Sequence, residues 1–119
     1  MESILQSIKK LLGISSEDTH FDMDIILHIN AAFATLHQLG VGPENTFVIE
    51  DDKPTWYDFT EDDDQFNNVK PYVYLSVRLI FDPPTSSFVL SAMERQLKEL
   101  EWRLNVSASN KSTEGNEDE

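Results

Sequence analysis

The chain has 119 residues, a hydrophobic fraction of 39% and a formal net charge of −13, which fit one globular domain and leave no room for two ordinary cores. Because the chain contains no cysteine, disulfides, thiolate metal ligands and a cysteine nucleophile are all excluded. No apolar run approaches the roughly 20 residues of a membrane-spanning helix, so we expect no association with a membrane.

Two amphipathic helices are predicted before residue 40. Residues 3–12 place apolar side chains at helical spacing, and Gly13 can end that helix in the left-handed conformation. A second helix is predicted to begin at Asp22 or Asp24, where carboxylates can cap free N–H groups, and to end before Gly40. The N-terminus lacks the basic and apolar regions of a signal peptide, so we expect a soluble protein that is intracellular when it is made.

Residues 41–68 form a predicted insert between the second and third helices. Residues 46–50 and 55–59 are rich in β-branched and aromatic side chains, and the sequence Asp-Asp-Lys-Pro between them is typical of a turn. We therefore predict a short β-hairpin. The three consecutive aspartates at residues 62–64 repel one another, and we expect them to form a solvated turn.

The third helix is predicted to begin at Asn67 or Asn68, either of which can act as N-cap. Pro71 would then lie in the first turn, where its missing N–H costs little. The residue before a proline disfavours the α conformation, so the helix should stop at Phe81 or Asp82, ahead of a double proline.

A fourth helix is predicted after the double proline, capped within residues 85–87. Apolar side chains then alternate at spacings of three and four, which is typical of a helix packed along another: Leu90, Met93, Leu97, Leu100 and Leu104. The expected fold is mainly α, a bundle of about four helices. It occupies residues 1–105, and a disordered acidic tail follows at residues 106–119.

The negative charge is concentrated in two segments. Residues 44–64 hold nine acidic residues and one lysine, a net of −8, and the chain from residue 107 holds four acidic residues and one lysine, a net of −3. The rest of the chain is close to neutral. Such a charge distribution repels phosphates and argues against sequence-specific DNA binding.

Four aromatic residues allow two interpretations. Trp56, Tyr57 and Phe59 lie in the predicted hairpin, and Trp102 lies on the last helix. They form either a small core under the hairpin or an interface with another subunit or partner, where exposed Trp and Tyr commonly act as anchors. Trp102 falls outside the apolar stripe of its helix, which favours the interface for that residue.

No catalytic or metal-binding pattern is recognisable. His28 and His37 are nine residues apart, which is not the i,i+4 spacing that presents two ligands to one metal. Asp62, Asp63 and Asp64 lack the glycine and the closing glutamate of an EF-hand loop. We therefore predict no enzymatic activity, no cofactor and no metal site.

Four stretches carry a resemblance to a known family. They are Ile-Lys-Lys-Leu-Leu-Gly-Ile at residues 8–14, the long helix ending in Leu39-Gly40, Phe-Asp-Pro-Pro at residues 81–84, and Glu-Leu-Glu-Trp-Arg-Leu at residues 99–104. Together they resemble the head–tail connector (adaptor) proteins of long-tailed bacteriophages. The resemblance covers most of residues 1–105, and its motifs are structural rather than catalytic.

The resemblance implies a structural virion protein at the head–tail junction, made in the host cytoplasm. Proteins of that family form a ring, generally of twelve subunits, beneath the portal protein, and a further neck or tail protein docks on the ring. DNA would pass through without specific binding, and Asp62, Asp63 and Asp64 are candidates to face its channel, since negative walls repel phosphates.

The alternative function is a small acidic regulator, a DNA mimic that binds a basic nucleic-acid-binding partner. A mimic needs carboxylates spread over a rigid face, whereas this chain concentrates them in an insert and a tail. That distribution favours the structural interpretation.

Overall fold

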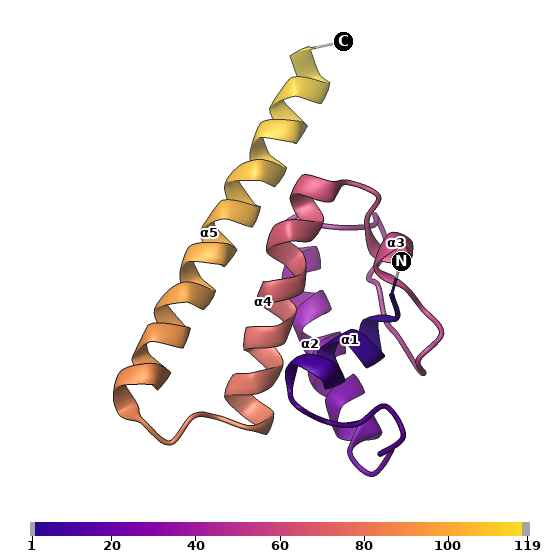
Figure 1. The fold of residues 1–119 in the computed structure, drawn as a ribbon. Helices are drawn as coiled ribbons and strands as arrows, with labels where there is room; N and C mark the ends of the chain where they lie inside the picture. The colour runs from indigo at the N-terminus through magenta and orange to yellow at the C-terminus, as the bar shows by residue number, and fades with distance from the viewer. Residues whose placement is uncertain (1, 118–119) are drawn as a thin grey trace.

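The computed structural model describes residues 2–117, with side chains described as far as Ser109. The described part of the chain is mainly helical and contains five helices and no strand: α1 (Ile4–Leu11), α2 (Asp22–Gln38), α3 (Trp56–Phe59), α4 (Asp63–Phe81) and α5 (Ser87–Glu117). Helix α4 lies centrally, with α1 and α2 on one side and α5 on the other (Figure 1). The expected mainly α fold is confirmed.

Helices α1 and α2 form where the sequence predicts them. The Ser3 hydroxyl caps α1 by accepting a hydrogen bond from the Gln6 N–H, at 3.3 Å. Gly13, with φ +80°, and Gly40, with φ +82°, follow the two helices in the left-handed conformation that glycine adopts without strain. Helix α2 begins at Asp22, but its N-cap residue is Phe21, which makes no side-chain cap.

Helix α4 begins four residues earlier than the earlier of its two expected starts, so the expectation of Asn67 or Asn68 as N-cap is wrong. Asp62 is the N-cap instead, and its carboxylate accepts hydrogen bonds from the N–H groups of Asp64 and Gln65. Carboxylates at a helix N-terminus are stabilised by the helix dipole and by the free N–H groups. This stabilisation outweighs the repulsion among the three aspartates that led us to expect a solvated turn. Pro71 consequently lies inside α4 and not in its first turn.

The predicted β-hairpin is also wrong. Residues 46–50 are irregular, and residues 56–59 form the short helix α3, which starts with a reciprocal cap between Thr55 and Asp58. A strand would turn Trp56 and Phe59 to opposite faces, whereas a helical turn places residues three apart on the same side. Both side chains are buried in the core, so burial favours the helical turn.

Asn30 of α2 holds the first half of the insert. Its side-chain amide donates a hydrogen bond to the Ile49 carbonyl at 3.0 Å, and its carbonyl oxygen accepts one from the Ile49 N–H at 2.8 Å. These two bonds give Ile49 the backbone pairing that a neighbouring strand would otherwise supply. Ile49 itself is buried, so the insert is attached to α2 both by packing and by hydrogen bonds.

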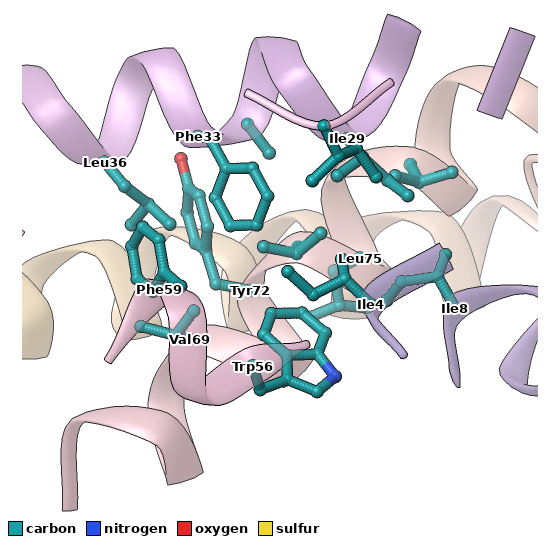
Figure 2. Close-up of a cluster of buried hydrophobic side chains, with 14 of the residues drawn as sticks. Ile4, Ile8, Ile29, Phe33, Leu36, Trp56, Phe59, Val69, Tyr72 and Leu75 are labelled. Atoms are coloured by element: carbon teal, nitrogen blue, oxygen red, sulfur yellow. The ribbon is translucent and has the colours of Figure 1, made fainter. Parts of the chain in front are cut away.

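The core joins the insert to the helices (Figure 2). Phe33 of α2 stacks on Phe59 with ring centroids 4.8 Å apart, and its edge-to-face contact with Trp56 is 6.2 Å. The buried indole N–H of Trp56 donates a hydrogen bond to the Ser7 hydroxyl at 2.8 Å, which in turn donates to the Ile4 carbonyl. The indole N–H and the Ser7 hydroxyl therefore both have hydrogen-bond partners inside the core.

Helix α5 packs antiparallel along α4, as the predicted helical hairpin requires (Figure 1). Leu100 and Leu104 of its apolar stripe are buried, and Ala108 is the last described side chain of α5 that packs against the core. The helical backbone continues to Glu117, past the expected domain end at residue 105. Disorder of the tail at residues 106–119 stays a prediction, and residues 118–119 lie outside the described part of the chain.

Candidate interaction surfaces

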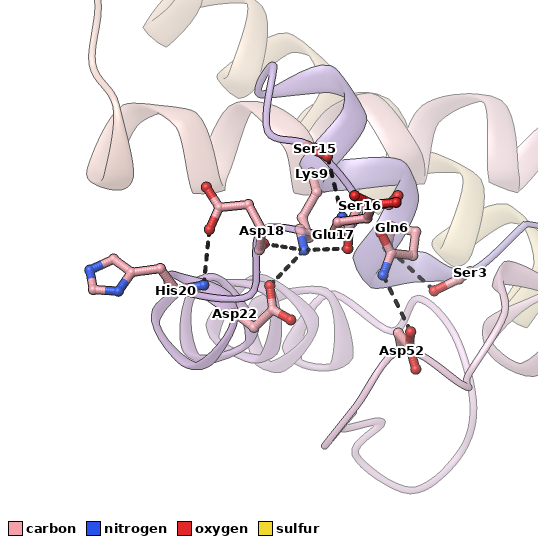
Figure 3. Close-up of polar contacts among 10 residues, drawn as sticks. All are labelled: Ser3, Gln6, Lys9, Ser15, Ser16, Glu17, Asp18, His20, Asp22 and Asp52. Carbon is pink, nitrogen blue, oxygen red and sulfur yellow. Dashed lines mark hydrogen bonds and ion pairs between the residues drawn. The ribbon is translucent and has the colours of Figure 1, made fainter.

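A buried lysine fixes the loop between α1 and α2 (Figure 3). The Lys9 side chain is fully buried, and its ammonium lies 2.8 Å from the Asp22 carboxylate. It also donates hydrogen bonds to the backbone carbonyls of Ser16, at 3.4 Å, and Asp18, at 2.7 Å. These contacts all close the loop onto the two helices, so this polar cluster serves folding. In the sequence, Lys9 is marked only by its position in the last turn of α1, where a cation suits the helix dipole.

Trp56 and Phe59, two of the four candidate interface residues, belong to the core of the domain. Their exposed fractions are 0% and 4%, so of the two interpretations that the sequence leaves open, the small core applies to them. Tyr57 is 51% exposed and Trp102 is 66% exposed, so both are accessible to a partner. An interface role for this second pair stays a proposal.

The three consecutive aspartates have different surroundings. Asp62 is half-buried and caps α4, whereas Asp63 and Asp64 are exposed in the first turn of that helix. Within the described residues, no group of three or more histidine and carboxylate side chains is placed to hold a metal ion. The structure therefore gives Asp62 a folding role and leaves the other two accessible.

The exposed surface around Trp102 on α5 includes further residues that were not identified from the sequence. Phe88 is 79% exposed and Val106 is 38% exposed, and both lie on the same side of the helix as Trp102 because their spacings fit whole turns. We call the α5 outer face the side of the helix formed by Phe88, Arg95, Glu99, Trp102 and Val106, all of which are exposed. In the sequence this face is indicated by the spacing of Phe88, Trp102 and Val106, which are 14 and 4 residues apart and lie opposite the buried leucines.

A groove of about 240 Å³ lies between α2, α4 and α5, and its lining includes Tyr72 and Leu97. Burial, and then the neighbouring Glu101 carboxylate, raise the pKa of the Tyr72 phenol above its ordinary value of 10.0. The phenol forms hydrogen bonds with the side chains of Glu101 on α5 and Ser76 on α4. Since Tyr72 belongs to α4, this polar link joins the two helices of the hairpin.

Comparison with known families identifies the chain. A family model described as "Phage connector protein" matches residues 4–111, which include α1 to α4 and most of α5. The chain belongs to the phage connector protein family. No curated protein and no solved structure matches the connector.

Family membership gives the connector a structural role in the virion, in association with other head and tail proteins. The predicted resemblance to phage connectors is thereby confirmed. None of the described helices of the connector is both long enough and apolar enough to cross a membrane.

Proposed function

We propose that this connector assembles into a ring at the head–tail junction, between the portal protein and the tail, with twelve subunits as the expected number. The family match over residues 4–111 carries the proposal, since it spans α1 to α4 and most of α5. The exposed aromatic residues Phe88 and Trp102 support it, because such residues commonly anchor interfaces between subunits.

We assign the end of α5 to the contact with the portal. This segment continues as helix beyond Ala108 and projects past the N-terminal end of α4 (Figure 1). A short helix in water is marginally stable without a surface to pack on, so docking on a partner would stabilise it. A further neck or tail protein would then bind the opposite side of the ring.

We assign Asp63 and Asp64 to the wall of the DNA channel. Both carboxylates are exposed at the first turn of α4, where they add to the negative charge of the insert. A negative wall releases no counterions from DNA and does not retain it. Asp62 is left out of this assignment because its carboxylate caps the helix.

Virions test the channel assignment directly. The double variant Asp63→Asn, Asp64→Asn should change DNA retention or ejection while rings still assemble. The control Glu17→Gln, Asp24→Asn removes two exposed carboxylates elsewhere on the surface and should behave like the unmodified protein. Equal behaviour of both variants in ejection would refute the channel role.

The ring itself is tested by native mass spectrometry and electron microscopy of the purified chain with the portal protein of the same phage. The portal is included because a connector that assembles on its partner is monomeric in isolation. A portal-bound ring is the expected result. A chain that stays monomeric with the portal, yet binds a basic DNA-binding protein tightly, would replace the ring with DNA mimicry.

A further inference from the structure

The connector carries two exposed surfaces on opposite edges. In Figure 1, α5 forms one edge of the molecule, and the insert with α3 forms the other, with α4 between them. The domain is a slab with extents of 50 × 35 × 20 Å. The α5 outer face and the insert therefore face away from each other and are not in contact within one subunit.

The α5 outer face combines apolar and basic side chains. Trp102 is 66% exposed, and exposed Arg95, Lys98 and Arg103 lie on or beside this face. Glu99 is the acidic residue among them, and its carboxylate pairs with Arg103 at 2.6 Å. Glu101 is half-buried and lies toward the α4 side, whereas exposed Glu94 lies one turn before Lys98 at the margin of this face. A basic face is the exception on a chain with a net charge of −13.

The insert has the complementary character. A groove of about 270 Å³ is lined by Val48, Glu50, Asp51, Lys53 and Pro54. Val48 is 57% exposed and offers an apolar contact, and both acidic side chains beside it are exposed. Such a groove fits an apolar side chain flanked by cations.

We propose that the α5 outer face of one connector subunit docks on the insert of a second copy, with Trp102 against the Val48 groove. Arg95 and Lys98 then face Glu50 and Asp51. The occupant is a second copy because both halves of the complementary pair belong to one chain. This inference rests on the proposed ring and specifies its subunit interface.

The arrangement is head-to-tail. Pairing two α5 outer faces would oppose like positive charges, and pairing two inserts would oppose carboxylates, so each self-pairing is disfavoured. A head-to-tail contact leaves one free surface of each kind on the pair, one on each subunit, and repetition closes into a ring when the rotation permits.

Charge reversal tests the pairing. One variant carries Arg95→Glu and Lys98→Glu, and the other carries Glu50→Lys and Asp51→Lys. Each alone should lose assembly on the portal, whereas an equal mixture of the two, or one chain carrying all four changes, should regain it. A mixture that stays unassembled, or single variants that assemble normally, would overturn the interface.

Truncation of Trp102 tests the anchor. Trp102→Ala should weaken self-association by roughly tenfold or more, as expected for an aromatic anchor. Leu27→Ala is the matched control, because Leu27 is 65% exposed on α2, outside both surfaces. Equal association of the two variants would remove Trp102 from the interface.

The absence of cysteine makes disulfide mapping direct. Oxidation of assembled Val48→Cys, Val106→Cys protein should give a ladder of covalent oligomers, and each single-cysteine variant should stay monomeric on a denaturing gel. Met23→Cys with Val106→Cys is the control and should give no ladder. Covalent dimers from Val106→Cys alone would indicate a symmetric α5 contact and overturn the head-to-tail arrangement.

The tests separate this inference from the ring itself. Rings of unmodified protein that are insensitive to all these changes would overturn the interface and leave the ring intact. Failure of the unmodified protein to assemble with the portal would overturn both.

Discussion

The contact between Lys9 and Asp22 makes a quantitative prediction about folding. Lys9→Met keeps most of the apolar stem and removes the ammonium, which leaves the Asp22 carboxylate and two loop carbonyls without that partner. Removing one partner of a buried ion pair costs about 3–5 kcal/mol. Asp22 is 21% exposed and its loop is accessible, so water can replace part of the loss, and we expect about 2–3 kcal/mol.

Removing the negative charge of Asp22 should cost more stability than removing the positive charge of Lys9. Asp22→Asn leaves a fully buried ammonium with neutral partners, so we expect about 3–5 kcal/mol. In the double variant neither charge remains, and the loss should be smaller than the sum of the single losses by about 1–3 kcal/mol. Such losses are a large part of the roughly 5–15 kcal/mol stability of a typical domain.

The assay is urea unfolding followed by tryptophan fluorescence. In a Trp102→Phe background, Trp56 is the remaining tryptophan, and it is fully buried, so its emission follows loss of the core. The reasoning fails if Lys9→Met costs less than about 1 kcal/mol or if the two single losses are additive.

Three further predictions concern other elements. Gly42 has φ +95°, and a Cβ there would lie 2.5 Å from the Phe59 ring, so Gly42→Ala should lower stability by about 2–5 kcal/mol. Gly13→Ala is the control, because Gly13 has φ +80° but open space around it, and it should cost only about 1–2 kcal/mol in the same assay. Asp62→Ala removes the α4 cap and should cost about 1 kcal/mol; no loss in urea unfolding would contradict the capping role. The pKa of Tyr72 is raised in the folded state, so the contribution of the neutral phenol to folding stability is fully present below the unfolded pKa of 10.0 and is lost as the pH rises through the folded pKa. The stability of the unmodified protein should therefore fall more steeply above pH 10 than that of Tyr72→Phe. Parallel curves of stability against pH would contradict this.

The helical periodicity of the sequence predicted the elements that pack on one another over several turns. The end of α2 before Gly40, the end of α4 at Phe81 and the buried stripe at Leu100 and Leu104 follow from spacing, proline and glycine alone. In these segments local preference and core packing favour the same conformation, so either signal is sufficient.

The conformation of the insert could not be predicted in the same way, because tertiary contacts determine it. Trp56 and Phe59 have strand-forming side chains, yet their shared burial against Phe33 requires a helical turn. Ile49 takes its backbone partners from the Asn30 side chain, 19 residues away, which no local pattern indicates.

The surfaces were predictable only in part. Trp102 was identified because it lies outside the apolar stripe, and it is exposed. Phe88 also lies outside that stripe and is exposed, but the sequence did not identify it. The burial of Lys9 depends on the positions of the loop carbonyls that accept its hydrogen bonds, and residue spacing in the sequence does not predict those positions.

The central position of α4 has a consequence for how the domain opens. Since α5 packs mainly on α4, it can detach in a sub-global opening that leaves α1, α2 and the insert together. Slowest amide exchange is then expected in α4, whose hydrogen bonds open only with the whole domain. The rigid Asp82-Pro83-Pro84 segment limits the directions in which a released α5 can swing.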